Sequence, residues 1–366
     1  MPLFRYTMIF GVFLTKTIDY FADLGYYICV CVYANDINGG FMRPFSLKPP
    51  IKDYIWGGTR LRDEYGKESG LDRLAESWEL SCHKDGGSII DSGEFAGMPL
   101  TDFVKEHPET LGSNCSRFEY FPVLIKLIDA KDNLSVQVHP DDAYAKRVEG
   151  EYGKTEMWYI VDCDEGAQLI YGFKDKISRE DFRRAIEENT LLDCVNSVPV
   201  KKGDVFFIES GTLHAIGKGI LIAEIQQNSN TTYRVYDYGR VGADGKPREL
   251  HVEKALEVTA LQPPAVEYGQ KKKINRAGMW QTPLADCKYF TADKYDIFRS
   301  MQLETDTHTF RHILVLEGEG EVVCGDESIA FKKGSSVFVP AGSETCSIKG
   351  NCSIIITTIR YNKEEN

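Results

Sequence analysis

Residues 201–216 read KKGDVFFIESGTLHAI, and residues 332–348 read KKGSSVFVPAGSETCSI. Both stretches begin with a Lys-Lys-Gly turn, continue as a short apolar strand and reach a second turn that contains glycine. The first stretch continues to His214, whereas the second has Glu344 and Thr345 in this region and no histidine. This weak repeat predicts two related β-barrels, of which only the first has kept the histidine.

The chain around the repeat is rich in strand-like runs. Short stretches of β-branched and aromatic residues alternate with turns that contain glycine or aspartate. Many short strands at near-regular spacing are typical of an antiparallel barrel or jelly roll. We therefore predict a mainly β fold, with one barrel over residues 42–265 and a second over residues 266–366. The polar, basic stretch 267–278 (EYGQKKKINRAG) reads as a linker. The clearest strand runs are 123–130 (VLIKLIDA), 157–163 (MWYIVDC), 167–173 (AQLIYGF), 205–210 (VFFIES) and 219–227 (GILIAEIQQ).

Helical periodicity predicts a small helical segment beside the barrels. In ISREDFRRAIEENT, Ser178 is a candidate N-cap and the apolar residues fall on one helical face. Thr101 is the candidate cap of a second helix in LTDFVKEHPETLG, and HVEKALEVTALQ reads as a third. Asp141 and Asp142 are best explained as caps of the helix that begins DDAYAKRV.

Four residues form the strongest chemical signal in the sequence. Gln137 and His139 lie two positions apart in LSVQVHP, so on a strand their side chains point the same way. Together with Glu156 in GKTEMWYI and with His214, they make a mixed nitrogen and oxygen ligand set for a divalent metal. Such a set suits zinc or a neighbouring first-row metal, and a set without cysteine is more typical of a catalytic site. The pattern therefore predicts a metalloenzyme, with the metal in the first barrel and none in the second.

Composition and charge exclude some partners. The chain has 366 residues, of which 42% are hydrophobic and 27% are charged, as in an ordinary globular protein. The net charge of -12 argues against a nucleic-acid surface, which needs a basic face. A local cluster of lysine and arginine can still bind a small anion. The ten cysteines are irregularly spaced and form no CxxC pair, so we expect mostly buried free thiols.

Residues 1–41 are the least typical part of the chain. Their apolar runs, MIFGVFL and YYICVCVYA, fall short of the ~20 residues that a membrane helix needs. Lys16, Asp19 and Asp23 interrupt the apolar core that a signal peptide requires. We expect the folded protein to begin near Met42 and the extension to lie outside the native fold, with a signal or anchor and an ordered extra element as alternatives. We expect no membrane partner and a cytoplasmic location.

Several stretches together resemble a known family. The segment from Gly203 to His214, in which an apolar strand is followed by Gly-x-x-His, resembles a motif of the cupin fold. More closely, the chain resembles type I mannose-6-phosphate isomerases in their short bacterial form, through six stretches in the family's order. These are YIWGGTRL (54–61), ESWELS (76–81), FPVLIKLIDAKDNLSVQVHPDD (121–142), GKTEMWYI (153–160), GTLHAIG (211–217) and QQNSNTTYRVYDYGR (226–240). The resemblance covers nearly everything after residue 42.

The resemblance implies an activity and roles for particular residues. It implies a zinc-dependent aldose–ketose isomerase that interconverts D-mannose 6-phosphate and D-fructose 6-phosphate, with one zinc ion on the four ligands above. The family's active-site lysine falls on Lys154 and its active-site arginine on Arg234. The chain departs from the family at Asn230, where Asn-Ser-Asp is usual and an acid has been assigned a role in ring opening or proton handling. That departure puts this role in doubt here.

The chemistry leaves two points open. A proton must move between C1 and C2 through a cis-enediol, and either Lys154 or a metal-bound hydroxide could take it. Lys154 would have to lose its own proton, which a nearby metal cation favours by like-charge repulsion. Arg234 could hold the phosphate or the enediolate, although an ion pair with Asp237 is an alternative. Lys126 is a further candidate for a basic substrate pocket.

Two aromatic residues and two rival functions complete the predictions. Trp56 and Trp78 could form a wall for a sugar ring, although packing in the core is the commoner role of tryptophan.

The rival functions are another metal-dependent cupin enzyme, such as an iron dioxygenase, and a sugar-phosphate-binding protein without turnover. We expect a small-molecule sugar phosphate as partner, and a monomer or a weak homo-oligomer.

Overall fold

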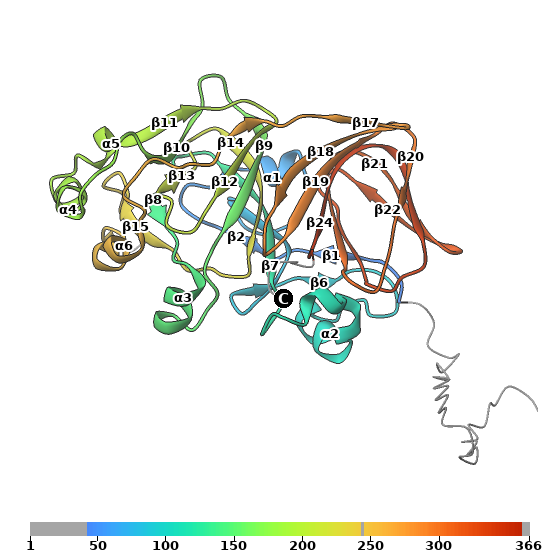
Figure 1. Ribbon diagram of the computed structural model, residues 1–366. Coiled ribbons are helices and arrows are strands. Elements are labelled where there is room, and N and C mark those ends of the chain that lie inside the picture. The colour runs from blue at the N-terminus through green and yellow to red at the C-terminus, as the bar shows by residue number, and fades with distance from the viewer. Residues whose placement is uncertain (1–41, 243–244, 361–366) are drawn as a thin grey trace, which may run out of the picture. The chain divides into compact units, whose positions relative to one another are not determined.

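Residues 42–242 and 245–360 are described by a computed structural model. The predicted extension at 1–41 lies outside this part of the chain. The described fold is mainly β, as the sequence predicts, with short helices, most of them at the periphery (Figure 1). None of the helices in the described ranges is both long enough and apolar enough to span a membrane.

Two antiparallel sheets form the first barrel. The larger sheet has the strand order β16-β12-β9-β14-β7-β3-β2, and the smaller one has the order β11-β10-β13-β8-β15. The strands of the larger sheet are β2 (Ile51–Lys52), β3 (Glu76–Leu80), β7 (Val123–Ala130), β9 (Glu156–Cys163), β12 (Asp204–Ile208), β14 (Ile220–Gln227) and β16 (Gly269–Gln270). Those of the smaller sheet are β8 (Val136–Val138), β10 (Gln168–Phe173), β11 (Val195–Pro199), β13 (His214–Ala215) and β15 (Tyr233–Tyr236).

A ten-stranded sheet forms the second barrel, with its main path β17-β18-β19-β24-β21-β23-β1-β6. Its two longest strands, β21 and β24, pair with each other over most of their length. The strands are β1 (Phe45–Lys48), β6 (Ile89–Ile90), β17 (Ile274–Arg276), β18 (Met279–Asp286), β19 (Thr291–Ile297), β20 (Ser300–Leu303), β21 (Arg311–Cys324), β22 (Glu327–Lys332), β23 (Ser336–Val339) and β24 (Cys346–Thr358). A separate hairpin pairs β4 (Cys82–His83) with β5 (Gly86–Gly87).

The helices are short. They are α1 (Arg60–Asp63), α2 (Leu100–Glu106), α3 (Asp142–Val148), α4 (Arg179–Glu187), α5 (Leu191–Cys194) and α6 (Val252–Val258), with 3₁₀ turns at Pro108–Leu111 and Ser113–Cys115. Helices α2 to α6 lie at the margin of the sheets, whereas α1 packs near β7 (Figure 1). Ser178 caps α4 and Asp141 caps α3, as predicted, because each side chain accepts a hydrogen bond from a first-turn amide. The predicted cap at Thr101 is wrong: α2 begins at Leu100, and Pro99, two residues before Thr101, holds the cap position without a side-chain hydrogen bond.

The glycines of the sequence repeat adopt the same backbone conformation in both barrels. Gly203 and Gly334 have φ values of 92° and 86°, and Gly211 and Gly342 have φ values of 88° and 75°. A side chain would strain the backbone in this region of φ. The two copies therefore share both turns, and Thr345 occupies the position in the second copy that His214 has in the first.

The two barrels exchange strands across the predicted boundary. β1 comes from the N-terminal part but pairs with β23 of the second barrel, and β16 pairs with β12 of the first. The interpretation of 267–278 as a linker is wrong, because this stretch contains β16 and β17. Both are short edge strands: β16 pairs with the distant β12, and β17 forms a local hairpin with β18. The division at residue 265 stays a prediction.

Three apolar clusters lie inside and between the barrels. One fills the first barrel around Trp158 and Phe206, and one fills the second around Val315 and Ile354. The largest joins the outer face of the larger first-barrel sheet to the second barrel; it includes Val123, Leu221, Phe310 and Phe338. The two barrels are therefore held together by apolar burial, which is the dominant favourable term in folding.

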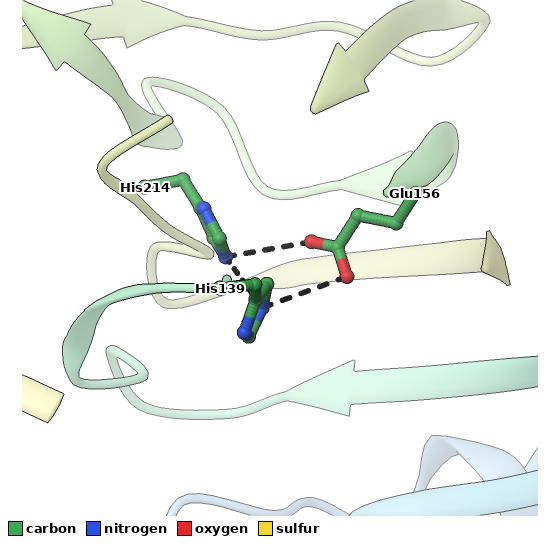
Figure 2. A group of neighbouring side chains, drawn as sticks. All are labelled: His139, Glu156 and His214. Carbon is green, nitrogen blue, oxygen red and sulfur yellow. Dashed lines mark hydrogen bonds and ion pairs between the residues drawn. The ribbon is translucent and has the colours of Figure 1, made fainter. Parts of the chain in front are cut away.

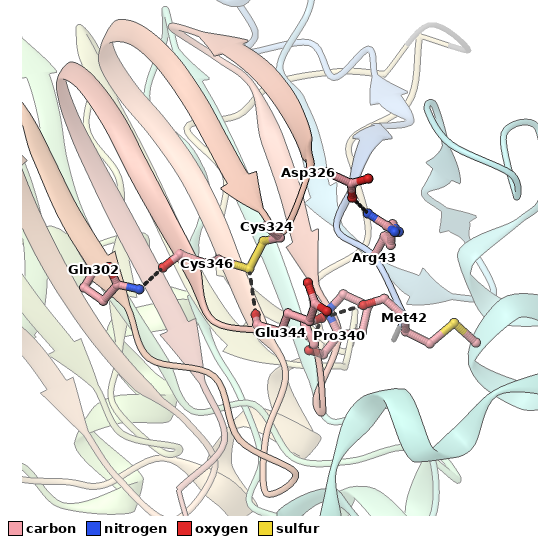
Figure 3. The surroundings of a disulfide bond; sticks show 9 residues. Met42, Arg43, Gln302, Cys324, Asp326, Pro340, Glu344 and Cys346 are labelled. Atoms are coloured by element: carbon pink, nitrogen blue, oxygen red, sulfur yellow. Dashed lines mark hydrogen bonds and ion pairs between the residues drawn. A yellow bond between two sulfur atoms is a disulfide. The ribbon is translucent and has the colours of Figure 1, made fainter. Parts of the chain in front are cut away.

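The prediction of mostly buried free thiols is confirmed only in part: most described cysteines are free, but among these only Cys115 and Cys352 are buried, and one pair forms a disulfide. Among the described cysteines, Cys82, Cys115, Cys163, Cys194, Cys287 and Cys352 are free. Cys324 and Cys346 face each other across β21 and β24 and form a disulfide (Figure 3).

Candidate metal centre and active site

His139, Glu156 and His214 meet inside the first barrel (Figure 2). One ligand atom from each lies within 4.8 Å of the others, and all three side chains are buried. The Nε2 atoms of His139 and His214 are 3.1 Å apart. The Glu156 carboxylate oxygens lie 3.7 Å from His139 Nε2 and 3.4 Å from His214 Nε2. Three strand ends supply the group, since His139 follows β8, Glu156 begins β9 and His214 begins β13.

The hydrogen bonds of the two histidines fix which nitrogen faces the centre. His139 Nδ1 is 2.9 Å from the carbonyl of Thr231, and His214 Nδ1 is 2.8 Å from the carbonyl of Thr212. A carbonyl only accepts, so each Nδ1 must donate. In the neutral rings both Nε2 atoms then carry a lone pair toward the same point. This is the tautomer and the orientation of metal-binding histidines.

The electrostatics of the group fit a bound cation. Both Glu156 oxygens are buried; Oε1 accepts no hydrogen bond from the described residues, and Oε2 lies 3.0 Å from the Lys154 ammonium. Burial raises the pKa of Glu156 to about 8 and lowers the pKa of His214 to about 3. Two facing nitrogen lone pairs beside a buried carboxylate are costly unless a positive charge lies among them, and the Lys154 ammonium contacts only Oε2 of Glu156. These three residues could therefore hold a metal ion.

Gln137 lies at the edge of this group. It is the register partner of His214 across β8 and β13, and its amide nitrogen is 3.4 Å from His214 Nε2. Turning the amide by half a rotation would bring the oxygen, a possible ligand, to the same place. Its role as fourth ligand stays a prediction.

A cavity of about 290 Å³ adjoins the metal group, which is close to the lower limit for small-molecule sites. It brings together most of the residues predicted for the site: Trp56, Lys126, Gln137, Lys154 and Arg234 line it.

Trp78 lies apart from this lining. It is fully buried, and its indole nitrogen donates to Glu76 at 2.7 Å. Its position fits core packing better than a wall for a sugar ring. Trp56 is also largely buried but does border the cavity.

Lys126 belongs to a buried row of charges. Its ammonium lies 3.5 Å from Glu76 and 3.2 Å from Glu224, on the neighbouring strands β3 and β14. Burial disfavours the charged lysine, but the two carboxylates outweigh this and raise its pKa. The pKa of Glu224 is lowered, because Lys126 and Lys154 oppose the effect of burial. Lys126 is therefore already neutralised by its neighbours.

Sequence reasoning did not single out Glu76 or Glu224. Glu224 stands inside the apolar run GILIAEIQQ, and Lys126 stands inside VLIKLIDA. Opposite charges inside two apolar runs, Lys126 in one and Glu224 in the other, were a signal that the two strands pair.

Lys154 and Arg234 have different kinds of partner: a carboxylate for Lys154, and a hydroxyl and a backbone carbonyl for Arg234. Lys154 is buried, and its ammonium is 3.0 Å from Glu156. Arg234 donates to Ser135 Oγ at 3.2 Å and to the carbonyl of Glu249 at 3.0 Å. The alternative ion pair with Asp237 is wrong, because Arg240 and Arg248 occupy that carboxylate.

The pKa of Arg234 is lowered, first by burial and then by Arg248 and Arg240. Arg248 lines the same cavity. One part of the cavity wall is therefore rich in positive charge.

Asn230 also borders the cavity, and it has an acidic neighbour. Its side-chain amide donates to Asp85 at 2.8 Å. Asp85 in turn lies 3.6 Å from Nδ1 of the buried His83. Asn230, where the family resemblance leads us to expect an acid, therefore contacts the carboxylate of Asp85 from another part of the chain.

Comparisons with known proteins agree over most of the chain. The description "Phosphomannose isomerase type I, catalytic domain" matches residues 44–166, and "Mannose-6-phosphate isomerase, cupin domain" matches residues 281–359. The chain is 40% identical to the mannose-6-phosphate isomerase of Streptococcus mutans, over 85% of this chain and 97% of that protein. It is 39% identical to the isomerase ManA of Bacillus subtilis, over 86% and 98% of the two chains.

Solved structures give the same picture. The crystal structure of the Bacillus subtilis mannose 6-phosphate isomerase superposes with a TM-score of 0.81 at 36% identity, over 86% of this chain and 99% of that one. The apo form of the Salmonella typhimurium enzyme, at 17% identity and a TM-score of 0.68, shares the fold.

Proposed function

Since the chain belongs to the type I phosphomannose isomerase family, we propose that it interconverts D-mannose 6-phosphate and D-fructose 6-phosphate with one zinc ion bound by Gln137, His139, Glu156 and His214. The observation that carries the proposal is the pair of Nε2 atoms 3.1 Å apart beside the buried Glu156 carboxylate, whose Oε1 accepts no hydrogen bond from the described residues. A neutral histidine pair with one carboxylate leaves a bound divalent ion with net positive charge.

The bound zinc ion would supply a Lewis acid for substrate oxygen, as metal ions do in catalysis. The chain's own residues supply the remaining chemistry. Lys154, buried and 3.0 Å from Glu156, moves the proton between C1 and C2: as a neutral amine it takes the proton from one carbon, and as the resulting ammonium it returns the proton to the other. Trp56 covers one side of the sugar.

Arg234 binds the phosphate, and Arg248 adds positive charge beside it although Asp237 already accepts from two of its nitrogens. The guanidinium group matches phosphoryl oxygens with paired donors, and the partial burial of Arg234 limits competition from water. Lys126 is less suited to the phosphate, because Glu76 and Glu224 already take up its charge. It positions these carboxylates at the cavity wall.

The zinc ligands can be tested by metal content and activity together. We expect one zinc per purified wild-type chain, and less than about a tenth of that in Glu156→Gln, which keeps the size of the side chain and removes its charge. Activity should fall at least 100-fold, because changing a group that only supports a metal ligand already costs about 10–100-fold. Glu94→Gln makes the same change at an exposed position and should alter neither the zinc content nor the activity. Full zinc occupancy in Glu156→Gln would contradict the assignment.

A further inference from the structure

A second cavity, of about 300 Å³, lies between the two barrels. Tyr159 and Val161 of β9 form one wall, and Thr282 of β18 and Lys294 of β19 belong to the other. β18 lies beside β9 where the barrels meet (Figure 1). Tyr159 follows directly after Trp158, which borders the metal-site cavity. Adjacent strand residues point to opposite faces, so the two cavities lie on opposite sides of β9.

The charges around this cavity are unbalanced. Its lining contains four lysines and two carboxylates, in a chain whose net charge is -12. The lysines are Lys202, Lys271, Lys273 and Lys294, and the carboxylates are Asp296 and Glu317. The lining therefore carries an excess of two positive charges, against the sign of the whole chain.

Each carboxylate is shared between lysines. Asp296 is paired with Lys294 and lies 3.7 Å from Lys273. Glu317 lies 3.4 Å from Lys202 and 3.4 Å from Lys333, which stands outside the lining. No carboxylate can fully compensate two ammonium groups, so the lysines keep the capacity to bind an anion.

Lys294 is the most enclosed of the four. It is 7% exposed, and its pKa is lowered, chiefly because burial disfavours its charge more than Asp296 favours it. A buried ammonium whose charge is incompletely balanced gains from an added anion.

Thr282 supplies an independent observation. It is 6% exposed, and its hydroxyl has no hydrogen-bond partner among the described residues. It is the register partner of Lys294 across β18 and β19, so both side chains stand on the same face of the sheet. A buried hydroxyl without a partner costs free energy unless a ligand or water satisfies it.

We propose that this cavity between the barrels binds a small phosphate monoester through Lys202, Lys273, Lys294 and the hydroxyl of Thr282. Two excess positive charges match a phosphate dianion, and the volume leaves room for a small organic group beyond the phosphate. The site goes beyond the isomerase function and shares no described lining residue with the metal-site cavity. Because its walls come from both barrels, the bound ligand stabilises their junction.

The site can be tested by calorimetric titration of the zinc-loaded full chain with glycerol 2-phosphate, and with inorganic phosphate in parallel. The first variant is Lys202→Glu/Lys273→Glu, in which both side chains are more than half exposed. We expect the wild type to bind one molecule of glycerol 2-phosphate more per chain than this variant. Tighter binding of glycerol 2-phosphate than of inorganic phosphate identifies the monoester, and the reverse identifies free phosphate, as the ligand.

Controls separate the site from general charge effects. Lys105→Glu/Lys349→Glu makes the same change of charge at exposed positions elsewhere and should keep the wild-type stoichiometry. Isomerase activity should stay within twofold in both double variants, so failure of the proposed function would not affect this test. Equal stoichiometry and affinity in the wild type and in Lys202→Glu/Lys273→Glu would overturn the proposal.

Thr282→Val tests the hydroxyl alone. The exchange keeps the volume and removes a donor, so the unliganded protein should be as stable as the wild type or more stable. Affinity for the probe at this site should fall about tenfold, as expected for a lost hydrogen bond to a charged group. Thr357→Val removes another buried hydroxyl without a described partner, outside the cavity, and should leave affinity unchanged. Equal affinity in Thr282→Val and the wild type would also overturn the proposal.

Discussion

At the scale of single residues, the buried row of Glu76, Lys126 and Glu224 is held by mutual compensation of charge. Lys126→Met keeps an unbranched side chain but leaves two buried carboxylates without their cation. We expect the free energy of unfolding to fall by about 3–5 kcal/mol, because an unpaired buried charge is strongly destabilising. Urea unfolding measures the change. Lys349→Met, at an exposed ion pair, should change it by less than about 1 kcal/mol. A comparably small effect of Lys126→Met would refute the role of the row.

Asn230 leads to a second prediction at this scale. Asn230→Asp introduces the acid that the family resemblance leads us to expect, but it also places a carboxylate where the amide now donates to Asp85 at 2.8 Å. We expect turnover no higher than that of the wild type, and a loss of stability of about 1 kcal/mol from like-charge repulsion. The double variant Asn230→Asp/Asp85→Asn should recover the stability. A clear rise in kcat for Asn230→Asp alone would show that the acid is missing from this site.

The metal group was visible in the sequence because each of its members stands in a local pattern. Gln137 and His139 share one strand, and His214 follows a recognisable turn. The partners of Lys126 were not visible, because the register of β3, β7 and β14 brings them together from distant parts of the chain. Single-strand patterns predict which residues face inward, but they do not specify which strands become neighbours.

At the scale of single helices and strands, apolar runs located strands correctly, and capping residues located the starts of α3 and α4. VLIKLIDA became β7 with the predicted bounds, and Ser178 caps α4. The failures have physical reasons. Pro99 starts α2 earlier than Thr101 suggested, and the polar stretch 267–278 forms edge strands whose stability comes from pairing with β12 and β18.

The disulfide between β21 and β24 gives a prediction for these strands. Cys324 and Cys346 are 22 residues apart, and closing a loop of this length in the unfolded chain stabilises the fold by about 3 kcal/mol. A reductant should therefore lower the melting temperature of the wild type. Cys324→Ala/Cys346→Ala should melt near the reduced wild type and should not respond to reductant. An equal response of this variant would place the reductant's effect elsewhere in the chain.

His312 on β21 predicts a pH dependence of stability. Its Nε2 is 2.7 Å from Ser336 Oγ, which donates to the carbonyl of Glu79, so the ring must donate through Nε2. Its buried Nδ1 has no described partner, and burial lowers the pKa of His312 to about 3. The folded state therefore binds fewer protons than the unfolded state between pH 6.5 and 3. Stability present above pH 6.5 is lost as the pH falls through this window, by at most roughly 5 kcal/mol.

The variant His312→Gln isolates this contribution. It keeps an N–H donor for Ser336 and cannot be protonated in this window. Its unfolding free energy should fall less steeply between pH 6.5 and 3 than that of the wild type, as measured by urea unfolding at several pH values. Parallel curves would show that His312 does not titrate as its burial requires.

At the scale of the whole described chain, the apolar surface between the barrels makes them one folding unit. Strands β1 and β16 cross between the barrels, and the largest apolar cluster joins them. The repeat in the sequence predicted two barrels but not this exchange, because it depends on pairing between residues nearly 300 positions apart. We expect cooperative unfolding of both barrels together, which is why a ligand in the cavity between them would stabilise the whole.

The central claim is that a metal-dependent isomerase site lies in the first barrel. The most direct test is a coupled assay of mannose 6-phosphate consumption on the purified full chain, before chelation, after chelation and after zinc is added back. We predict that activity disappears as the metal is removed and returns with about one zinc per chain. Absence of turnover in a folded, fully zinc-loaded sample, or full activity after complete removal of metal, would contradict the account.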